Sequence, residues 1–165
     1  MKRSTAGVPV LLLLGLLTTG CSKPVDTQAD QAAMDFLGSN AVYVLSNPTK
    51  LEGWNFQRPD GSMASEAPIR LLDAGLAKEL GKILLDGETY KVPARSGSFE
   101  KVVGYRVTRA NQSVELYFSF GNDQMLVKYP GYTGQATTST AGVTAAHERL
   151  VKLAQRAFGD YKPTK

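Results

Sequence analysis

Residues Lys101–Tyr129 read KVVGYRVTRANQSVELYFSFGNDQMLVKY, and this stretch decides the fold. Apolar and polar side chains alternate along it in three runs, which is the pattern of strands with one buried face. Both breaks between the runs contain Asn, a residue that tolerates the backbone of tight hairpin turns. The stretch therefore predicts three consecutive antiparallel strands. The side chains expected on the buried face are Val103, Tyr105, Val107, Val114, Leu116, Phe118, Phe120, Met125, Val127 and Tyr129.

The positions of the turns also predict the strand register. If the first turn is Asn111-Gln112, Val107 lies opposite Leu116. If the second turn is Asn122-Asp123, Phe120 lies opposite Met125.

The polar side of the same strands carries a candidate binding face of Arg106, Tyr117 and Lys128. Tyr and Arg are enriched at the hot spots of protein interfaces, which favours a contact with another protein. The alternative interpretation is that these long side chains only cover an open sheet face.

The flanking segments complete the prediction of an α+β fold. Ala41–Leu45 and Leu51–Phe56 are rich in β-branched and aromatic residues and predict two strands. A helix is expected behind Asp73, and a second helix over about residues 144–158, because apolar residues recur there at helical spacing. The predicted order is β-β-α-β-β-β-α, an antiparallel sheet with two helices packed on one face. The Gly/Thr/Ser-rich segment 130–142 is expected to be an exposed loop.

The first twenty-one residues have the organisation of an export signal. Lys2 and Arg3 precede an apolar run of about ten residues, Val8–Leu17, which is shorter than the roughly 20 residues that span a bilayer. The sequence that follows, Leu17-Thr18-Thr19-Gly20-Cys21, resembles the lipobox of bacterial lipoproteins, although Thr18 stands where Leu is most common. An uncleaved anchor or a buried N-terminal helix is the alternative.

The lipobox resemblance implies cleavage between Gly20 and Cys21 and acylation of Cys21, so that acyl chains on Cys21 attach the protein to a membrane. In Gram-negative lipoproteins Asp after the cysteine commonly signals retention in the inner membrane. Ser22 at that position implies the outer membrane, with the domain facing the periplasm. The expected organisation is a signal peptide over residues 1–20, a lipidated N-terminus and flexible tether over 21–40, and one α+β domain over 41–161.

Composition excludes several classes of function. The 165 residues include one Cys and one His, which exclude an intrachain disulfide framework and leave no Cys- or His-rich metal site, so no metal or cofactor is expected. Loss of Lys2 and Arg3 with the signal peptide lowers the formal net charge from +4 to +2. An exported chain of this charge is not expected to bind nucleic acid.

Two short patterns that suggest catalysis are expected to be chance matches. Ser98 and Lys101 have the S-x-x-K spacing of serine acyl-enzymes, but they lie in a Gly/Ser-rich segment instead of a helix. His147 could act as a base only if the fold places a nucleophile beside it.

A second resemblance covers roughly residues 41–160. Segments 80–90, 104–108, 114–127 and 153–158 are similar to a group of small uncharacterised bacterial exported domains, whose members carry Cys-Phe-x-Cys-Asp in the second strand of the meander. Here the positions read Ser119-Phe120-Gly121-Asn122-Asp123, so a redox, disulfide or metal role does not carry over.

These observations together predict a lipid-anchored protein of the bacterial cell envelope. Its domain is expected to be a non-enzymatic binding module for a protein or an envelope component. The alternatives are an inhibitor or immunity lipoprotein that blocks an enzyme and, from a different class, an envelope hydrolase. A hydrolase would need a convergent set of Ser, Asp, Glu or His side chains that the spacing does not indicate.

Overall fold

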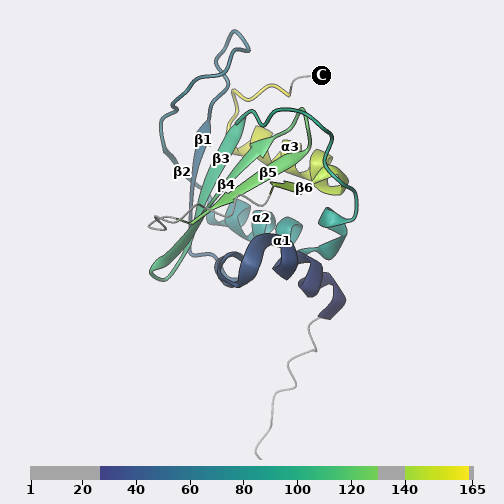
Figure 1. The fold of residues 1–165 in the computed structure, drawn as a ribbon. Coiled ribbons are helices and arrows are strands. Elements are labelled where there is room, and N and C mark those ends of the chain that lie inside the picture. The colour runs from purple at the N-terminus through teal and green to yellow at the C-terminus, as the bar shows by residue number, and fades with distance from the viewer. Residues whose placement is uncertain (1–26, 130–139, 164–165) are drawn as a thin grey trace, which may run out of the picture.

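The computed structural model of the protein describes residues 27–129 and 140–163, so the expected signal peptide and Cys21 lie outside the described residues. Within them the chain forms a six-stranded antiparallel sheet in the order β2-β1-β3-β4-β5-β6, and the helices cover one side of this sheet (Figure 1). The predicted α+β class with an antiparallel sheet is confirmed. The elements are α1 Thr27–Ser46, β1 Lys50–Asn55, β2 Arg70–Leu72, α2 Ala74–Leu85, β3 Val103–Arg109, β4 Gln112–Ser119, β5 Gln124–Lys128, β6 Thr140–Gly142 and α3 His147–Ala157, with short 3-10 helices η1 Gly87–Tyr90 and η2 Thr144–Ala146.

The central meander β3-β4-β5 forms with the predicted faces but not with the predicted register. Val107 pairs with Val114 instead of Leu116, and Met125 pairs with Phe118 instead of Phe120. Each shift is two residues, which leaves every side chain on its expected face because the period of a strand is two. The first turn is Ala110-Asn111, where Ala110 takes a positive φ of 53° that the Asn-based turn rule does not anticipate.

The prediction of a strand over Ala41–Leu45 is wrong, because these residues form the second half of α1. Val42 and Val44 favour strands locally, but the buried residues of this half, Ala41, Val44 and Leu45, recur at helical spacing. Within the described residues the order of elements therefore begins with a helix, and three α-helices, not two, cover the sheet. Gly38, with φ 76°, divides α1 into two helical halves.

Two boundaries differ from the predicted ones. The described part of the expected tether, residues 27–40, belongs to α1, so the folded part begins before residue 41. Tyr129 ties this region to the sheet, since its hydroxyl donates a hydrogen bond to the carbonyl of Leu37. At the other end of the meander, Thr140–Gly142 is not loop but strand β6, paired with β5; the preceding residues 130–139 lie outside the described ranges.

The helical layer and the inner face of the sheet share one apolar core. Asp73 caps α2 as predicted, with its side chain accepting a hydrogen bond of 2.6 Å from the backbone N–H of Gly75. No helix in the described ranges is long and apolar enough to cross a bilayer. The largest fully buried side chains of the core are Leu37, Leu45, Leu51, Leu80, Leu84, Tyr105, Leu116, Phe118, Met125, Leu150, Leu153 and Phe158.

The place of α1 in the core can be tested with a matched pair of substitutions. We expect Leu37→Ala to lower the free energy of unfolding by about 2–5 kcal/mol, because it leaves a cavity at a fully packed site. Met34→Ala, on the exposed side of the same helical half, should change it by less than about 0.5 kcal/mol. Urea unfolding followed by circular dichroism measures both, and equal small effects would mean that α1 is not part of the cooperative core.

Candidate functional site

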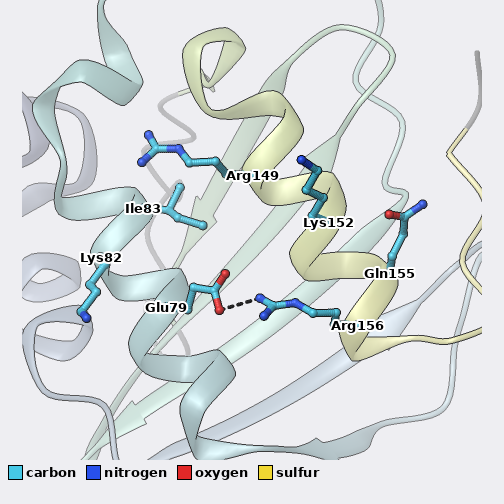
Figure 2. A pocket seen from close by; sticks show the side chains of 7 residues that line it. All are labelled: Glu79, Lys82, Ile83, Arg149, Lys152, Gln155 and Arg156. Atoms are coloured by element: carbon cyan, nitrogen blue, oxygen red, sulfur yellow. Dashed lines mark ion pairs between the residues drawn. The ribbon is translucent and has the colours of Figure 1, made fainter.

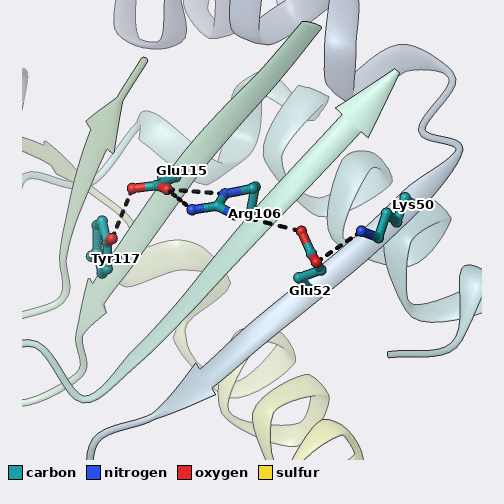
Figure 3. A network of polar contacts seen from close by, with 5 residues as sticks. All are labelled: Lys50, Glu52, Arg106, Glu115 and Tyr117. Carbon is teal, nitrogen blue, oxygen red and sulfur yellow. Dashed lines mark hydrogen bonds and ion pairs between the residues drawn. The ribbon is translucent and has the colours of Figure 1, made fainter. Parts of the chain in front are cut away.

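The outer face of the sheet, which is the side opposite the helices, carries a row of alternating charges. Glu52 of β1, Arg106 of β3, Glu115 of β4 and Lys128 of β5 lie at paired positions on four neighbouring strands. We call these four residues the charged row. Figure 3 shows the contacts at its centre, where the Arg106 guanidinium lies between the two carboxylates.

Arg106 is the best-anchored member of this row. Its Nη2 and Nε lie 2.6 and 3.0 Å from Oε1 of Glu115, and its Nη1 lies 3.7 Å from Oε2 of Glu52. The hydrogen bond with Glu115 raises the pKa of Arg106 above its usual range. Lys50 binds the other oxygen of Glu52 at 2.8 Å, so both carboxylates of the row are engaged by cations. The guanidinium is thus held in one position by contacts from both sides.

Next to the charged row lies an aromatic row on the same face: Trp54 of β1, Gly104 of β3, Tyr117 of β4 and Leu126 of β5. The rings of Trp54 and Tyr117 stack across Gly104 with centroids 6.0 Å apart. A Cβ at Gly104 would lie 2.9 Å from the Tyr117 ring and 3.2 Å from Trp54, so only glycine allows both rings to cover β3. Phe56, Phe99 and Ala67 complete this second, smaller apolar cluster.

Cations surround the aromatic row. The Arg106 guanidinium lies 5.2 Å from the centre of the Trp54 ring. Lys101 and Lys128 place their ammonium groups 5.1 and 5.4 Å from the centre of the Tyr117 ring. Burial, and then the hydrogen bond that the Tyr117 hydroxyl donates to Glu115, raise the pKa of Tyr117 to about 12. The phenol is therefore neutral at physiological pH.

All three residues of the predicted binding face lie on the outer face and are connected to one another. Arg106 and Tyr117 share Glu115, and Lys128 lies over Tyr117. No role on this face was predicted for Glu115, Glu52, Gly104 or Lys101. The pattern of alternation could have indicated Glu52, because β1 alternates as the meander does, but the role of Gly104 depends on the register.

A groove of about 670 Å³ lies on the opposite side of the molecule, between α2 and α3. Ile83 contributes apolar surface to its lining, and Figure 2 shows Glu79 and Arg156 pointing toward each other across it, at 2.5 Å. Arg149 binds Asp86 at 3.2 Å and also lines the groove. Glu79–Arg156 is thus one ion pair between the two helices, and among the described residues neither Lys82 nor Lys152 forms an ion pair. We assign no chemistry to this groove.

Asp123 and His147 form a contact that the sequence spacing does not indicate. Asp123 is fully buried at the turn between β4 and β5; its Oδ1 lies 2.5 Å from Nδ1 of His147, and its Oδ2 lies 3.1 Å from Nε of Arg95. Its backbone carbonyl accepts a hydrogen bond from the N–H of Val143, so the turn is tied to the segment that leads into α3. A carboxylate orienting a histidine is also part of catalytic triads. Among the described residues, however, no hydroxyl, thiol or amine forms a hydrogen bond with His147.

The S-x-x-K pair falls in irregular chain before β3. The Ser98 carbonyl accepts a hydrogen bond from the Asn122 side chain, whereas Lys101 lies over Tyr117. No hydrogen bond joins these two side chains to each other in the described ranges. The part of the chain that the structure describes also contains no group of three or more His, Cys, Asp or Glu side chains arranged to hold a metal ion.

Comparison with known proteins gives a likeness of fold. The sequence matches no protein-family model and no curated protein. The fold is similar to the crystal structure of a "putative lipoprotein" from Clostridium perfringens, with a TM-score of 0.50 and 11% sequence identity over 76% of this chain and 96% of that chain. At this identity the likeness concerns the fold alone.

The close approach over Gly104 leads to a test of the aromatic row. We expect Gly104→Ala to destabilise the protein by about 1–3 kcal/mol, because the added methyl group forces apart two packed rings. The fluorescence of Trp54, the single tryptophan of the chain, should shift to longer wavelength as the indole gains contact with water. Gly121→Ala is the control, since nothing lies within 4 Å of a Cβ at that position. Equal changes in stability and in Trp54 fluorescence for the two variants would contradict the packing described for this row.

Proposed function

We propose that this chain is a lipid-anchored protein of the bacterial cell envelope, acylated at Cys21, whose domain is a non-enzymatic binding module. The outer face of the sheet, with the charged row and the aromatic row, is the proposed contact surface for a protein or an envelope component. The outer membrane, with the domain facing the periplasm, is the proposed location.

The observation that carries the anchor is the position of Cys21. It is the one cysteine of the chain and directly follows an apolar run with a positively charged start, in a context that resembles a lipobox. The similarity in fold to a chain described as a "putative lipoprotein" agrees with this proposal. Several acyl chains on one residue give stable attachment to a membrane, so the polypeptide itself need not insert.

The observation that favours binding is the rigidity of the outer face. Arg106 and Tyr117 are both held by Glu115, so little conformational entropy is lost when a partner covers them. Lys101 and Lys128 contact Tyr117 through cation–π geometry, and in the described ranges neither forms an ion pair. Their charges are available to a carboxylate of a partner.

The inhibitor or immunity lipoprotein is the runner-up within the same location, and it differs in predicting a tight one-to-one complex with an enzyme. An envelope hydrolase would be supported by the Asp123–His147 contact. It would also need a nucleophile within hydrogen-bonding reach of His147, and the described contacts include none.

The anchor is tested first, by mass spectrometry of the N-terminal peptide from fractionated cells. We expect the natural chain to start at an acylated Cys21 in the membrane fraction and the Cys21→Ser chain to lose both the acyl mass and the membrane association. Retention of residues 1–20, or a free Cys21 thiol on a soluble chain, would contradict the proposal.

The contact surface is tested by cross-linking in intact cells followed by purification of the protein. A specific cross-linked partner should be lost in Lys101→Glu/Lys128→Glu and kept in Lys78→Glu/Lys152→Glu, which makes the same change of charge on the helical side. Circular dichroism checks that both variants fold. Loss of the partner in both variants, or in neither, would contradict the outer face as the contact surface. The stoichiometry of the purified complex distinguishes a binding module from an inhibitor.

A further inference from the structure

Two lysines of the outer face lie over the same aromatic ring without a carboxylate partner. Nζ of Lys101 lies 5.1 Å and Nζ of Lys128 lies 5.4 Å from the centre of the Tyr117 ring. In the part of the chain that the structure describes, neither ammonium group forms an ion pair, although Glu100 directly precedes Lys101. We call Lys101 and Lys128 the lysine pair.

Strand pairing alone would give Lys128 a carboxylate partner. It sets Lys128 opposite Glu115, and opposite charges at such positions normally attract each other. Both oxygens of Glu115 are engaged, however. Oε1 accepts hydrogen bonds from Arg106, and Oε2 accepts one of 2.8 Å from the Tyr117 hydroxyl (Figure 3). Tyr117 therefore competes with Lys128 for Glu115, and the Lys128 ammonium lies over the Tyr117 ring instead.

The second carboxylate of the charged row is engaged as well. Oε1 of Glu52 binds Lys50 at 2.8 Å, and its Oε2 lies 3.7 Å from Nη1 of Arg106. Lys50 and Arg106 thus balance the charges of Glu52 and Glu115. The lysine pair is positive charge in excess of this balance, and such charge attracts the anionic groups of a partner.

We propose that the lysine pair binds an acidic segment of a partner protein. This inference rests on the outer face being the contact surface in the proposed function, and it names the chemistry of the partner. The ammonium groups donate charge-assisted hydrogen bonds to Asp and Glu carboxylates. Tyr117 is a positioning residue, because its hydroxyl keeps Glu115 from neutralising Lys128.

The surroundings of the lysine pair favour a polypeptide over a sugar or a free anion. Trp54 and Tyr117 are only 8% and 9% exposed, so their rings offer little area on which a sugar could stack. An ion pair that stays exposed to water contributes little by itself, so a free anion is held weakly. A polypeptide adds contacts with the partly buried Phe99 and Leu126, which pack on the same aromatic cluster.

The test measures the binding of synthetic peptides to the full acylated chain in nanodiscs of phosphatidylcholine, by isothermal titration calorimetry at low salt. The probe is a peptide of alternating Glu and Ser, and two control peptides carry Gln or Lys in place of Glu. Inorganic phosphate and nanodiscs that contain phosphatidylglycerol are the other anionic ligands. Lys101→Gln/Lys128→Gln removes the lysine pair, and Lys78→Gln/Lys152→Gln is the matched control on the helical side.

We expect the Glu peptide to bind at least tenfold more tightly than the Gln and Lys peptides. Lys101→Gln/Lys128→Gln should lose at least tenfold in affinity for the Glu peptide, and Lys78→Gln/Lys152→Gln should lose none. Equal binding of the Glu and Gln peptides, or equal affinities of the two variants, overturns the inference. Tighter binding of inorganic phosphate or phosphatidylglycerol than of the Glu peptide overturns a polypeptide as the occupant.

Tyr117→Phe tests the positioning role, because it keeps the ring and removes no charge. We expect it to weaken binding of the Glu peptide several-fold, since Glu115 is then free to bind Lys128. Adding Glu115→Gln should restore the affinity, whereas a loss caused by altered packing would persist. Circular dichroism checks that each variant folds. Unchanged affinity in Tyr117→Phe, or no recovery in the double variant, overturns the role of Tyr117.

Failure of the inference is distinguishable from failure of the proposed function. If the partner cross-linked in intact cells is kept by Lys101→Glu/Lys128→Glu, the outer face is not the contact surface, and the inference fails with it. If that partner is lost but the Glu and Gln peptides bind alike, only the acidic chemistry of the partner is wrong.

Discussion

The pairing of β3 with β4 is the constraint on which the outer face depends. It sets Gly104 opposite Tyr117 and Arg106 opposite Glu115. The Tyr117 ring therefore fits over a glycine, and the Arg106 guanidinium meets the Glu115 carboxylate. In the register that the Asn-based turns predict, Arg106 would lie opposite Tyr117, and both matches would be lost. Cross-strand pairs contribute about 0.2–1 kcal/mol each, which is enough to decide between two registers that bury the same apolar residues.

Much of the fold follows from local patterns, and the failures have identifiable causes. Strict alternation gives β3–β5, residue types that favour strands indicate β1, and the capping of α2 follows from Asp73 at the position before the helix. The second half of α1 was mistaken for a strand because Val42, Tyr43 and Val44 favour strands over a short window. The buried residues Ala41, Val44 and Leu45 have helical spacing, but a window of five residues is too short for the pattern to distinguish a helix from a strand. Strands β2 and β6 have three residues each, and tertiary pairing, not their own sequence, makes them strands.

The candidate site was predictable in part. Alternation alone places Arg106, Tyr117 and Lys128 on one face, but which groups hold them depends on pairing across strands that are distant in sequence. The Asp123–His147 contact is a clearer case, since nothing local indicates that Asp123 is buried or that α3 begins beside it. Contacts of this kind arise from the packing of whole elements, and the spacing of residues along the sequence does not indicate them.

The position of α1 has a consequence for how the protein is made. Its buried stripe packs on α2 and on β3 and β4, which come much later in the chain. The ribosome synthesises α1 before any of these partners, so the apolar side chains of α1 stay exposed until the meander has also been synthesised. Contacts between such distant segments slow folding and leave the incomplete chain prone to aggregate. If the chain is exported as proposed, the late synthesis of these partners delays the burial of α1 and so favours the unfolded state that passage through a narrow channel requires.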